Sequence, residues 1–323
     1  MPLHQSLDRS LMTKLGAPVP GNILQGLQRA GGFSFFQPSR SPSPVSPRLA
    51  GSLGRIGPLE VRLAASRRDV KEAQRLRYRV FHEEMSAVPD LVSRLKRRDI
   101  DEYDAVCDHL LVIDHDAPAR HVMTRKGPVR TPAIVGTYRL LRQDRAEEAG
   151  GFYSAGEFDI DPMIQAHSAR SFLELGRSCV LAPYRTKRTI ELLWHGIWTY
   201  VLHHGVDVMF GCASLEGTDP ARHEQALAFL HRHARAPEPW RVRALPDRAV
   251  AMDAGASDLD PRCALHLLPP LIKGYLRVGA HVGDGAVVDH RFGTTDVLVV
   301  LPVESINPRY IHHFGADAGR HAA

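Results

Sequence analysis

Six charged residues lie where the neighbouring sequence predicts burial: Arg77, Asp101, Asp104, Arg139, Glu174 and Arg177. Arg77 falls on the apolar stripe of a predicted helix, and Arg139 lies inside the apolar run 134–141. Burying a charge is costly unless the charge is paired, so the three arginines and three carboxylates are expected to neutralise one another around a cleft. A purely structural cluster of ion pairs explains the same pattern, and some of the six are expected to be structural in either case.

A basic turn follows the apolar run 172–181. In this turn Arg185, Lys187 and Arg188 lead into the N-terminus of a predicted helix. Because a helix N-terminus presents free N–H groups and partial positive charge, the turn is suited to binding a phosphate group. An exposed basic turn without a ligand is an equally good interpretation of these residues alone.

Hydrophobic periodicity predicts the elements that must position these residues. Alternation at 59–64 predicts a half-buried strand, and an apolar stripe that starts after Ser66 predicts a helix to about Met85. Ser66 and Asp69 resemble a capping box at the start of that helix. Further strands are predicted at 110–114, 133–141, 172–181, 206–213 and 295–301, and further helices at 190–204 and 220–234. Gly205 is expected to end the first of these helices in a left-handed conformation.

The order of these elements predicts the fold class. Strand, helix, several consecutive strands, helix, strand and helix indicate an α/β (α+β) fold with a mixed sheet flanked by helices. Regular alternation of strands and helices, as in a doubly wound fold, is excluded. The ordered pattern begins at Leu59, so residues 59–310 are predicted to form the folded domain and residues 311–323 a C-terminal tail.

The net charge of +5 arises at the N-terminus. The 323 residues include 41 Lys and Arg against 36 Asp and Glu, and residues 1–58 hold six of the basic residues against one acid. The rest of the chain is therefore neutral, which argues against a nucleic-acid-binding domain. Eight of the 23 prolines also lie in 1–58, so this segment is predicted to be a disordered extension, with contact with an anionic membrane surface as the alternative.

Cysteine and histidine usage predicts neither disulfides nor a metal ion. Cys107, Cys179, Cys212 and Cys263 are too widely spaced for a CxxC motif and lie beside apolar residues, as buried free thiols do. A reducing cytoplasm is therefore expected. The 18 histidines include no HExxH motif, so no metal ion is expected. No segment approaches the roughly 18 consecutive apolar residues of a membrane-spanning helix.

Four spaced motifs resemble the charged signature of the acyl-homoserine-lactone synthases, which have the GNAT N-acyltransferase fold. The motifs are, in order, Arg77-xxx-Phe81, Asp101-xx-Asp104, Arg139-Leu-Leu and Glu174-xx-Arg177. Two departures disfavour lactone formation. The tryptophan that those synthases carry shortly after the Phe81 motif is absent, and about 120 residues follow the strand that starts at Val206.

Longer stretches resemble a sibling family, the L-ornithine N-alpha-acyltransferases of ornithine-lipid synthesis, also known as hemolysin-like GNAT proteins. These stretches are 107–112, 172–180 with Tyr184-Arg185, Leu193-Trp194-xx-Ile197 and 268–279. The motifs together span about residues 59–310, and the resemblance implies a GNAT-like, mixed and mostly antiparallel sheet there. It also implies transfer of a 3-hydroxy fatty acyl group from acyl carrier protein to the alpha-amine of L-ornithine, which gives lyso-ornithine lipid.

The same resemblance implies the partners and the location of the reaction. The donor would be the phosphopantetheine arm of acyl carrier protein, with no cofactor bound by the chain itself. The enzyme is then expected in the cytoplasm, with peripheral contact with the inner membrane as a further expectation, and with no nucleic-acid partner.

Within such a reaction, Glu174 is the candidate general base, because an amine must lose a proton before it attacks a thioester. Backbone N–H groups near Cys179 and Val180 are candidates to stabilise the oxyanion if the strand splays or bulges there. The phosphate of the arm is expected at the basic turn and the helix start. The candidate residues for it are Val180, Arg185, Thr186, Lys187, Arg188 and Thr189.

The spacing of Glu174 and Arg177 poses a geometric question. Residues three apart on an ideal strand point to opposite faces, so either a bulge brings the two together or they serve different partners. We expect Arg177 to pair with Asp101 or Asp104 as scaffold, which leaves Glu174 for the amine. Arg139 is a candidate for binding the carboxylate of ornithine, and Asp101 or Asp104 for binding its distal amine.

Three alternatives stay open on the sequence alone. An acyl-homoserine-lactone synthase, or a carrier-protein-dependent acyltransferase for another amino acid, would use related chemistry. A non-catalytic module that binds acyl carrier protein or a membrane would keep the fold without turnover. A nucleic-acid binder is the most distant of the three.

Overall fold

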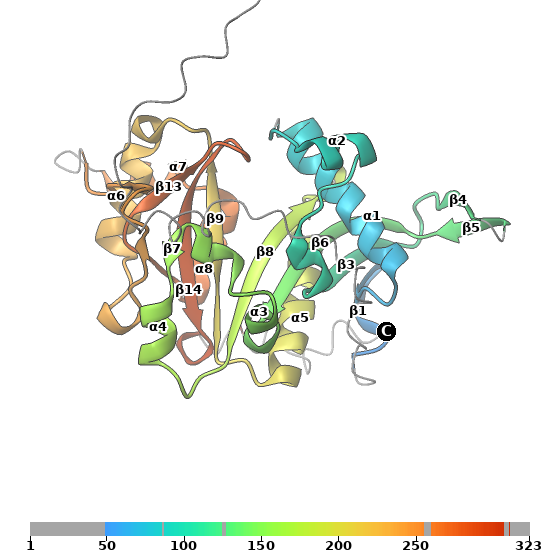
Figure 1. The fold of residues 1–323 in the computed structure, drawn as a ribbon, viewed down its shortest axis with the longest axis horizontal. Helices are drawn as coiled ribbons and strands as arrows, with labels where there is room; N and C mark the ends of the chain where they lie inside the picture. Colours follow the sequence, from blue (N-terminus) through green and yellow to red (C-terminus); the bar gives the residue numbers. More distant parts are fainter. Residues whose placement is uncertain (1–48, 86, 125–126, 255–259, 307–309, 311–323) are drawn as a thin grey trace, which may run out of the picture. The chain divides into compact units, whose positions relative to one another are not determined.

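The structure, a computed structural model, describes residues 49–310 except 86, 125–126, 255–259 and 307–309. These residues belong to a compact unit that spans 41–323. Its centre is a ten-stranded sheet (Figure 1). The strands of this sheet are β1 (Ser52–Ile56), β2 (Leu59–Leu63), β3 (Asp108–Asp114), β6 (Ala133–Arg142), β8 (Phe172–Val180), β9 (Val208–Glu216), β11 (Ala249–Val250), β12 (His281–Val282), β13 (Ala286–Asp289) and β14 (Thr294–Pro302).

Two smaller sheets and a set of helices complete the described part. The smaller sheets pair β4 (Arg120–Thr124) with β5 (Gly127–Thr131), and β7 (Phe158–Asp159) with β10 (Arg243–Ala244). The α-helices are α1 (Arg67–Tyr78), α2 (Leu91–Lys96), α3 (Gln143–Glu148), α4 (Asp161–Ala166), α5 (Lys187–His204), α6 (Glu224–His233), α7 (Pro261–Leu267) and α8 (Pro270–Val278). Short helical turns of other types are η1 (Arg79–Glu84), η2 (Glu102–Ala105), η3 (Tyr153–Gly156), η4 (Ala182–Tyr184), η5 (Pro220–His223), η6 (Glu238–Trp240) and η8 (Val303–Ser305).

The strand order confirms the predicted mixed sheet. The order is β1-β2-β3-β6-β8-β9-β14-β13-β11, and β12 also pairs with β14. Every neighbouring pair is antiparallel except β8 with β9, which run parallel. The strands and helices that the periodicity predicts all occur, with ends that differ by a few residues.

Helices cover both faces of the sheet, and β3 shows why. Successive strand residues point to opposite faces, so Leu111 and Ile113 pack with the apolar stripe of α1, while Leu110 and Val112 pack with that of α5. The predicted helix ends are also confirmed. The Ser66 hydroxyl accepts the N–H of Asp69 at the start of α1, and Gly205 ends α5 with φ of 60°.

The folded domain begins earlier than predicted, which corrects the boundary at residue 58. Ser52–Ile56 forms the edge strand β1 and pairs with β2, and the preceding Leu49 is only 3% exposed. Gly57 and Pro58 make the turn between the two strands, with Gly57 in the left-handed region at φ 59°. These turn residues resemble the Pro-rich composition before them, which hides the strand. The disorder predicted for residues 1–48 and the tail predicted at 311–323 lie outside the described residues.

Strands β8 and β9 diverge after a short parallel contact. Their register covers only Phe172–Glu174 against Val208–Phe210. Just beyond it, a Cβ built on Gly211 would lie 2.2 Å from the Leu175 carbonyl oxygen. Glycine is therefore required at 211, because any side chain would collide with the backbone of β8 at the point where the strands part.

None of the described helices is both long and apolar enough to cross a bilayer.

Gly211→Ala is expected to lower the free energy of unfolding by about 1–3 kcal/mol, because the added methyl group must push the two strands apart. Urea denaturation measures the change. Gly176→Ala is the matched control, since a Cβ built on Gly176 meets nothing within 4 Å. Equal stability of the two variants would show that β8 and β9 do not approach each other as described.

Candidate active site

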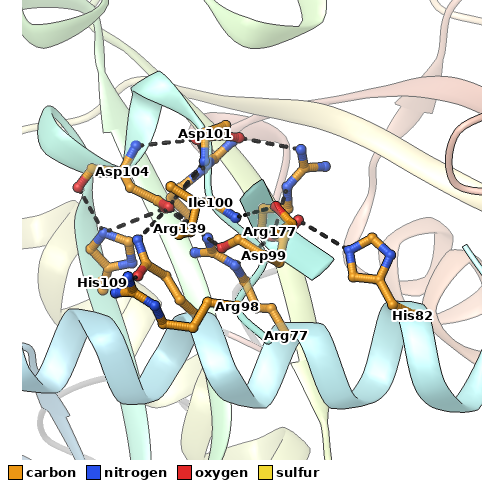
Figure 2. A network of polar contacts seen from close by, with 12 residues as sticks. Arg77, His82, Arg98, Asp99, Ile100, Asp101, Asp104, His109, Arg139 and Arg177 are labelled. Atoms are coloured by element: carbon orange, nitrogen blue, oxygen red, sulfur yellow. Dashed lines mark hydrogen bonds and ion pairs between the residues drawn. The ribbon is translucent and has the colours of Figure 1, made fainter. Parts of the chain in front are cut away.

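Arg77 lies at the centre of a buried set of ion pairs (Figure 2). Its Nε donates to Asp99 Oδ2 at 2.8 Å, and its Nη2 donates to both carboxylate oxygens of Asp104 at 2.8 Å. The same Nη2 also donates to the Asp99 carbonyl oxygen at 2.7 Å. Arg77 has no exposed surface, so its charge is neutralised entirely by the protein.

Two further arginines complete the set. Arg139 Nη1 contacts Asp101 Oδ1 at 2.6 Å and Asp104 Oδ1 at 3.4 Å. Arg177 Nη2 donates to Asp101 Oδ2 at 3.2 Å, and its Nε lies 3.5 Å from Asp99 Oδ2. We call these three arginines and three aspartates the arginine–aspartate cluster, which consists of Arg77, Asp99, Asp101, Asp104, Arg139 and Arg177.

The cluster confirms the predicted neutralisation and corrects its membership. Five of the six predicted residues meet, including the expected pair of Arg177 with Asp101. The third carboxylate is Asp99 rather than Glu174. The predicted spacing of Asp101 and Asp104 has a local cause, because the two side chains cap η2 reciprocally, each accepting the backbone N–H of the other.

The pKa shifts follow from this pairing. Burial would raise the pKa of Asp99, but Arg77, a hydrogen bond from His82 and the charges of Arg177 and Arg139 together outweigh burial and hold that pKa below its ordinary value. Burial would likewise raise the pKa of Asp101, and Arg139 and Arg177 lower it instead. Asp99 and Asp101 therefore stay charged at neutral pH. Arg139 forms ion pairs with Asp101 and Asp104. These pairs leave Arg139 poorly placed to bind the carboxylate of a substrate, and the two aspartates poorly placed to bind its distal amine.

A β-bulge settles how Glu174 and Arg177 share one face. In the pairing of β6 with β8, Thr137 lies opposite Cys179 and Arg139 opposite Gly176, so Arg177 and Ser178 together oppose the single residue Tyr138, one residue more on β8 than on β6. Arg177 sits in the left-handed region at φ 49°, which is strained for a residue with a side chain. Tyr153 contacts both side chains: its N–H donates to Glu174 Oε2 at 2.8 Å, and its hydroxyl accepts from Arg177 at 3.3 Å.

Glu174 lies at the last paired position before β8 and β9 diverge. Its carboxylate accepts three hydrogen bonds, from the N–H of Tyr153, the N–H of Ser154 and the Ser154 hydroxyl. An ionised carboxylate offers about four acceptor sites, so one stays open for an amine or a water molecule. Burial raises the pKa of Glu174, although the bonds from Ser154 and Tyr153 oppose the rise. A raised pKa favours proton acceptance.

The backbone N–H and C=O groups of Val180 face away from β6, on the side where β8 and β9 have diverged. Leu181 N–H donates to Val135 O in β6, so by the alternation of a strand the Val180 N–H and C=O face the other way. Arg185 Nε donates to that carbonyl at 3.0 Å, and Arg185 also pairs with Glu84. The Val180 N–H is thus a fixed donor on the side of β8 that faces away from β6, six residues along the strand from Glu174, and it stays a candidate oxyanion-binding group.

The basic turn is only partly as predicted. Thr186 caps α5 by accepting the N–H of Thr189 at 3.4 Å, and the Thr189 side chain is fully buried with its hydroxyl against that of Thr186. Thr189 is therefore structural. Lys187 is exposed and lies 3.4 Å from Glu191, and Arg188 is exposed next to it. These two residues remain available to an anion at the helix N-terminus.

Tyr184 lies just before this turn and is held as a neutral donor. Its hydroxyl donates to Asp114 Oδ2 at 2.6 Å. This hydrogen bond raises the pKa of Tyr184 to about 12, so the hydroxyl keeps its proton at neutral pH.

A second group of acids lies beyond Glu174, and the sequence analysis missed it. Ligand oxygens of Glu157, Asp289 and Asp296 all lie within 4.8 Å of one another, and we call these residues the acidic triad. Each is at most 9% exposed. Burial, together with the charges of Asp296 and Asp289, raises the pKa of Glu157 to about 7. Carboxylate oxygens also suit hard divalent cations, so the absence of a metal ion stays a prediction.

The raised pKa of Glu157 predicts a pH-dependent stability. Between pH 4.5 and about 7 the folded chain binds a proton that the unfolded chain has lost, so the free energy of unfolding falls as pH rises through this window. Glu157→Gln removes that loss. Relative to the wild type, the variant is expected to gain stability with rising pH, by up to about 3 kcal/mol above pH 7.

Urea denaturation at pH 5 and pH 8 measures this gain. Glu60→Gln is the control of opposite sign, because His115 and Arg55 hold the pKa of Glu60 below its ordinary value despite burial. That variant is expected to lose stability at pH 8. A Glu157→Gln variant whose stability follows the wild type at both pH values would show that Glu157 ionises normally.

The residues that sequence reasoning missed carry little local signal. Asp99 lies two residues before Asp101 in a short charged stretch, and such a stretch predicts an exposed surface segment. Ser154 and Tyr153 bind Glu174 largely through backbone N–H groups, which have no sequence signature. The triad joins three segments far apart in the chain. The one usable sign is Asp296, a carboxylate directly before the apolar run 297–301, on a strand where every position is buried.

Comparison with known proteins agrees with this architecture. Residues 76–195 match the acetyltransferase (GNAT) domain family, which confirms the predicted GNAT-like fold. The chain is 54% identical over 269 residues to the L-ornithine N(alpha)-acyltransferase of Rhizobium meliloti (strain 1021), a match that covers 83% of this chain and 88% of the relative. It is 51% identical over 269 residues to the protein of the same name from Brucella abortus (strain 2308), covering 83% and 92%. Among solved structures, FeeM, an N-acyl amino acid synthase from uncultured soil microbes, aligns over 76% of this chain and 91% of its own, with a TM-score of 0.43 and 10% identity.

Proposed function

The chain belongs to the family of L-ornithine N(alpha)-acyltransferases, and from this membership we propose that it transfers a fatty acyl group to the alpha-amine of L-ornithine. The observation that carries the proposal is the 54% identity over 83% of the chain. The site supports it, because β8 carries a buried carboxylate, Glu174, at the point where β8 and β9 part, and backbone N–H groups that no longer pair with β9 beyond that point.

The reaction assigns a role to each of these groups. The ammonium group of ornithine gives a proton to Glu174, directly or through water, and the free amine attacks the thioester carbon. Backbone N–H groups of β8 beyond its pairing with β9 are the candidates to stabilise the oxyanion that forms. As the tetrahedral adduct collapses, the new C–N bond is kept and the C–S bond breaks. The nitrogen releases its second proton to water, and the leaving thiolate takes a proton, for which Tyr184 is the candidate donor.

We assign the acyl donor to acyl carrier protein and the acyl group to the 3-hydroxy class. Lys187, Arg188 and the N-terminus of α5 support this assignment, because together they suit the phosphate of a phosphopantetheine arm. The arm would then run into the divergence of β8 and β9 beside Val180. Supplying one 3-hydroxyacyl group on acyl carrier protein or on coenzyme A tests the donor, and faster transfer from coenzyme A would contradict it.

Expression in a host that lacks ornithine lipids tests the whole function. Mass spectrometry of the extracted lipids is expected to show a new lyso-ornithine lipid with a 3-hydroxyacyl chain. An acyl-homoserine lactone, or an acylated amino acid other than ornithine, would instead support one of the alternative acceptors. A host whose lipids do not change would contradict the activity.

We also propose that the basic N-terminal segment brings this reaction to the inner membrane from the cytoplasmic side. Excess positive charge in residues 1–58 suits an anionic bilayer. Since β1 starts at Ser52, removal of residues 1–48 spares the sheet. The shortened chain is expected to keep its turnover with soluble substrates and to bind anionic vesicles more weakly. Unchanged vesicle binding would contradict the role of this segment.

A further inference from the structure

The acidic triad is joined to the candidate base by a short chain of contacts. The Ser154 hydroxyl donates to Glu174 Oε1 and lies 3.4 Å from Cys212 Sγ. Cys212 Sγ in turn donates to Glu157 Oε2 at 3.5 Å. The triad therefore lies next to the place where the proposed reaction puts the alpha-amine.

The charge of the triad is poorly balanced. Within the described part of the chain, the ion pair that reaches it is that of Arg248 with Glu157 at 3.5 Å, from a side chain that is 35% exposed. Asp289 Oδ1 accepts the backbone N–H groups of Arg291 and Phe292, which fixes its position without adding a positive charge. Three buried carboxylates thus face one ion-paired and partly exposed cation, Arg248, together with the more distant charge of Arg177, which lowers the pKa of Asp296 less than burial raises it.

An unpaired buried atom marks the same place. Asp296 is 6% exposed, and its Oδ1 has no hydrogen-bond partner among the residues that the structure describes. The hydroxyls of Ser214 and Thr294 lie beside Asp296 and lower its pKa, but they do not offset the rise that burial causes, and neither bonds Oδ1. A buried acceptor without a donor costs free energy. The site is therefore built to receive a positively charged donor.

We propose that Glu157, Asp289 and Asp296 bind the side-chain ammonium group of the amino-acid acceptor and so select a diamino acid over a neutral one. The inference rests on the proposed function and names the group that recognises its substrate. An ammonium group brings three donors, one for each carboxylate. Ca²⁺ would need six to eight oxygen ligands, of which the triad supplies three.

Asp296→Asn and Glu157→Gln test the proposal because each removes a charge while keeping the shape. The kinetics of L-ornithine are compared with those of L-norvaline, which has the same three-carbon side chain without the amine. Each variant is expected to raise KM for ornithine about 10- to 100-fold and to change kcat far less. The value of kcat/KM for norvaline is expected to stay level or to rise. Glu60→Gln is the matched control, because Glu60 lies on β2, five strands away from β14 in the sheet.

The outcomes separate the inference from the function beneath it. A wild-type chain that does not acylate ornithine contradicts the proposed function. A wild-type chain that does so, with variants that keep the full preference for ornithine over norvaline, overturns the inference alone. Activity that is lost on chelation with EDTA and restored by Mg²⁺ or Ca²⁺ assigns the triad to a metal ion and overturns it as well.

A measurement on the wild-type chain covers the case in which neither variant folds. Since the pKa of Glu157 is about 7, the KM for ornithine is expected to rise relative to that for norvaline as pH falls from 8 to 6. Both substrates carry an alpha-amine, so the effect of its protonation on KM largely cancels in the ratio of the KM for ornithine to that for norvaline. A ratio that does not change with pH would overturn the inference.

Discussion

Glutamine in place of Glu174 is expected to lower turnover by about two to four orders of magnitude, the usual contribution of a positioned general base. The amide fills the same space but cannot accept the proton that the ammonium group must lose. Steady-state kinetics with ornithine and an acyl donor measure the loss, and a thermal melt confirms that the variant is folded. Turnover within tenfold of the wild type would remove Glu174 as the base.

Ser154→Ala is the matched comparison for this variant. It removes the Ser154 hydroxyl that donates to Glu174 Oε1 and keeps both backbone N–H donors. The carboxylate then loses one stabilising bond, so its pKa is expected to rise further. Turnover is expected to fall by less than tenfold, with the acid limb of the pH profile of kcat/KM moved to higher pH. An unmoved limb would show that another group titrates.

Arg77→Met is expected to lower the free energy of unfolding by about 3–5 kcal/mol, or to prevent folding altogether. Methionine fills much of the space, but Asp99 and Asp104 lose the donors that hold them at 2.8 Å. Asp99 then keeps the 3.5 Å contact with Arg177, and Asp104 the 3.4 Å contact with Arg139, so two arginines must balance three buried carboxylates. Urea denaturation of the purified variant, or its yield as soluble protein, measures the effect.

Arg170→Met is the control for this change. Arg170 pairs with Glu304 at 2.9 Å, but the two side chains are 33% and 57% exposed. Exposed ion pairs contribute about 1 kcal/mol or less, so this variant is expected to stay close to the wild type. If Arg77→Met were as stable as Arg170→Met, the arginine–aspartate cluster would not hold the site together.

The sequence predicts the framework of the site well. Arg77, Arg139 and Arg177 are recognisable because charges seldom interrupt apolar stripes, Asp101 and Asp104 because they bracket Tyr103, and the structure brings all five together. The main strands and helices follow from periodicity, which depends only on neighbours in the chain. The edge strand β1 is missed because its turn at Gly57 and Pro58 resembles the Pro-rich segment before it.

The parts that escape prediction depend on contacts between distant segments. Arg177 and Glu174 share a face only because of the bulge at Arg177. Glu174 does not pair with an arginine of the cluster, because its carboxylate accepts backbone N–H groups of η3 instead. The residues of the acidic triad come from the end of η3, from β13 and from β14. Their spacing in the sequence does not indicate that they meet. Alternation and capping are local, whereas these contacts are tertiary.

Purified chain supplied with L-ornithine labelled with ¹⁵N at the alpha position and with a 3-hydroxyacyl donor tests the central claim most directly. Fragmentation of the product by mass spectrometry locates the acyl group. The account predicts an amide at the labelled alpha-nitrogen and a free side-chain amine. An acyl group on the side-chain nitrogen, or no transfer to ornithine at all, would contradict it.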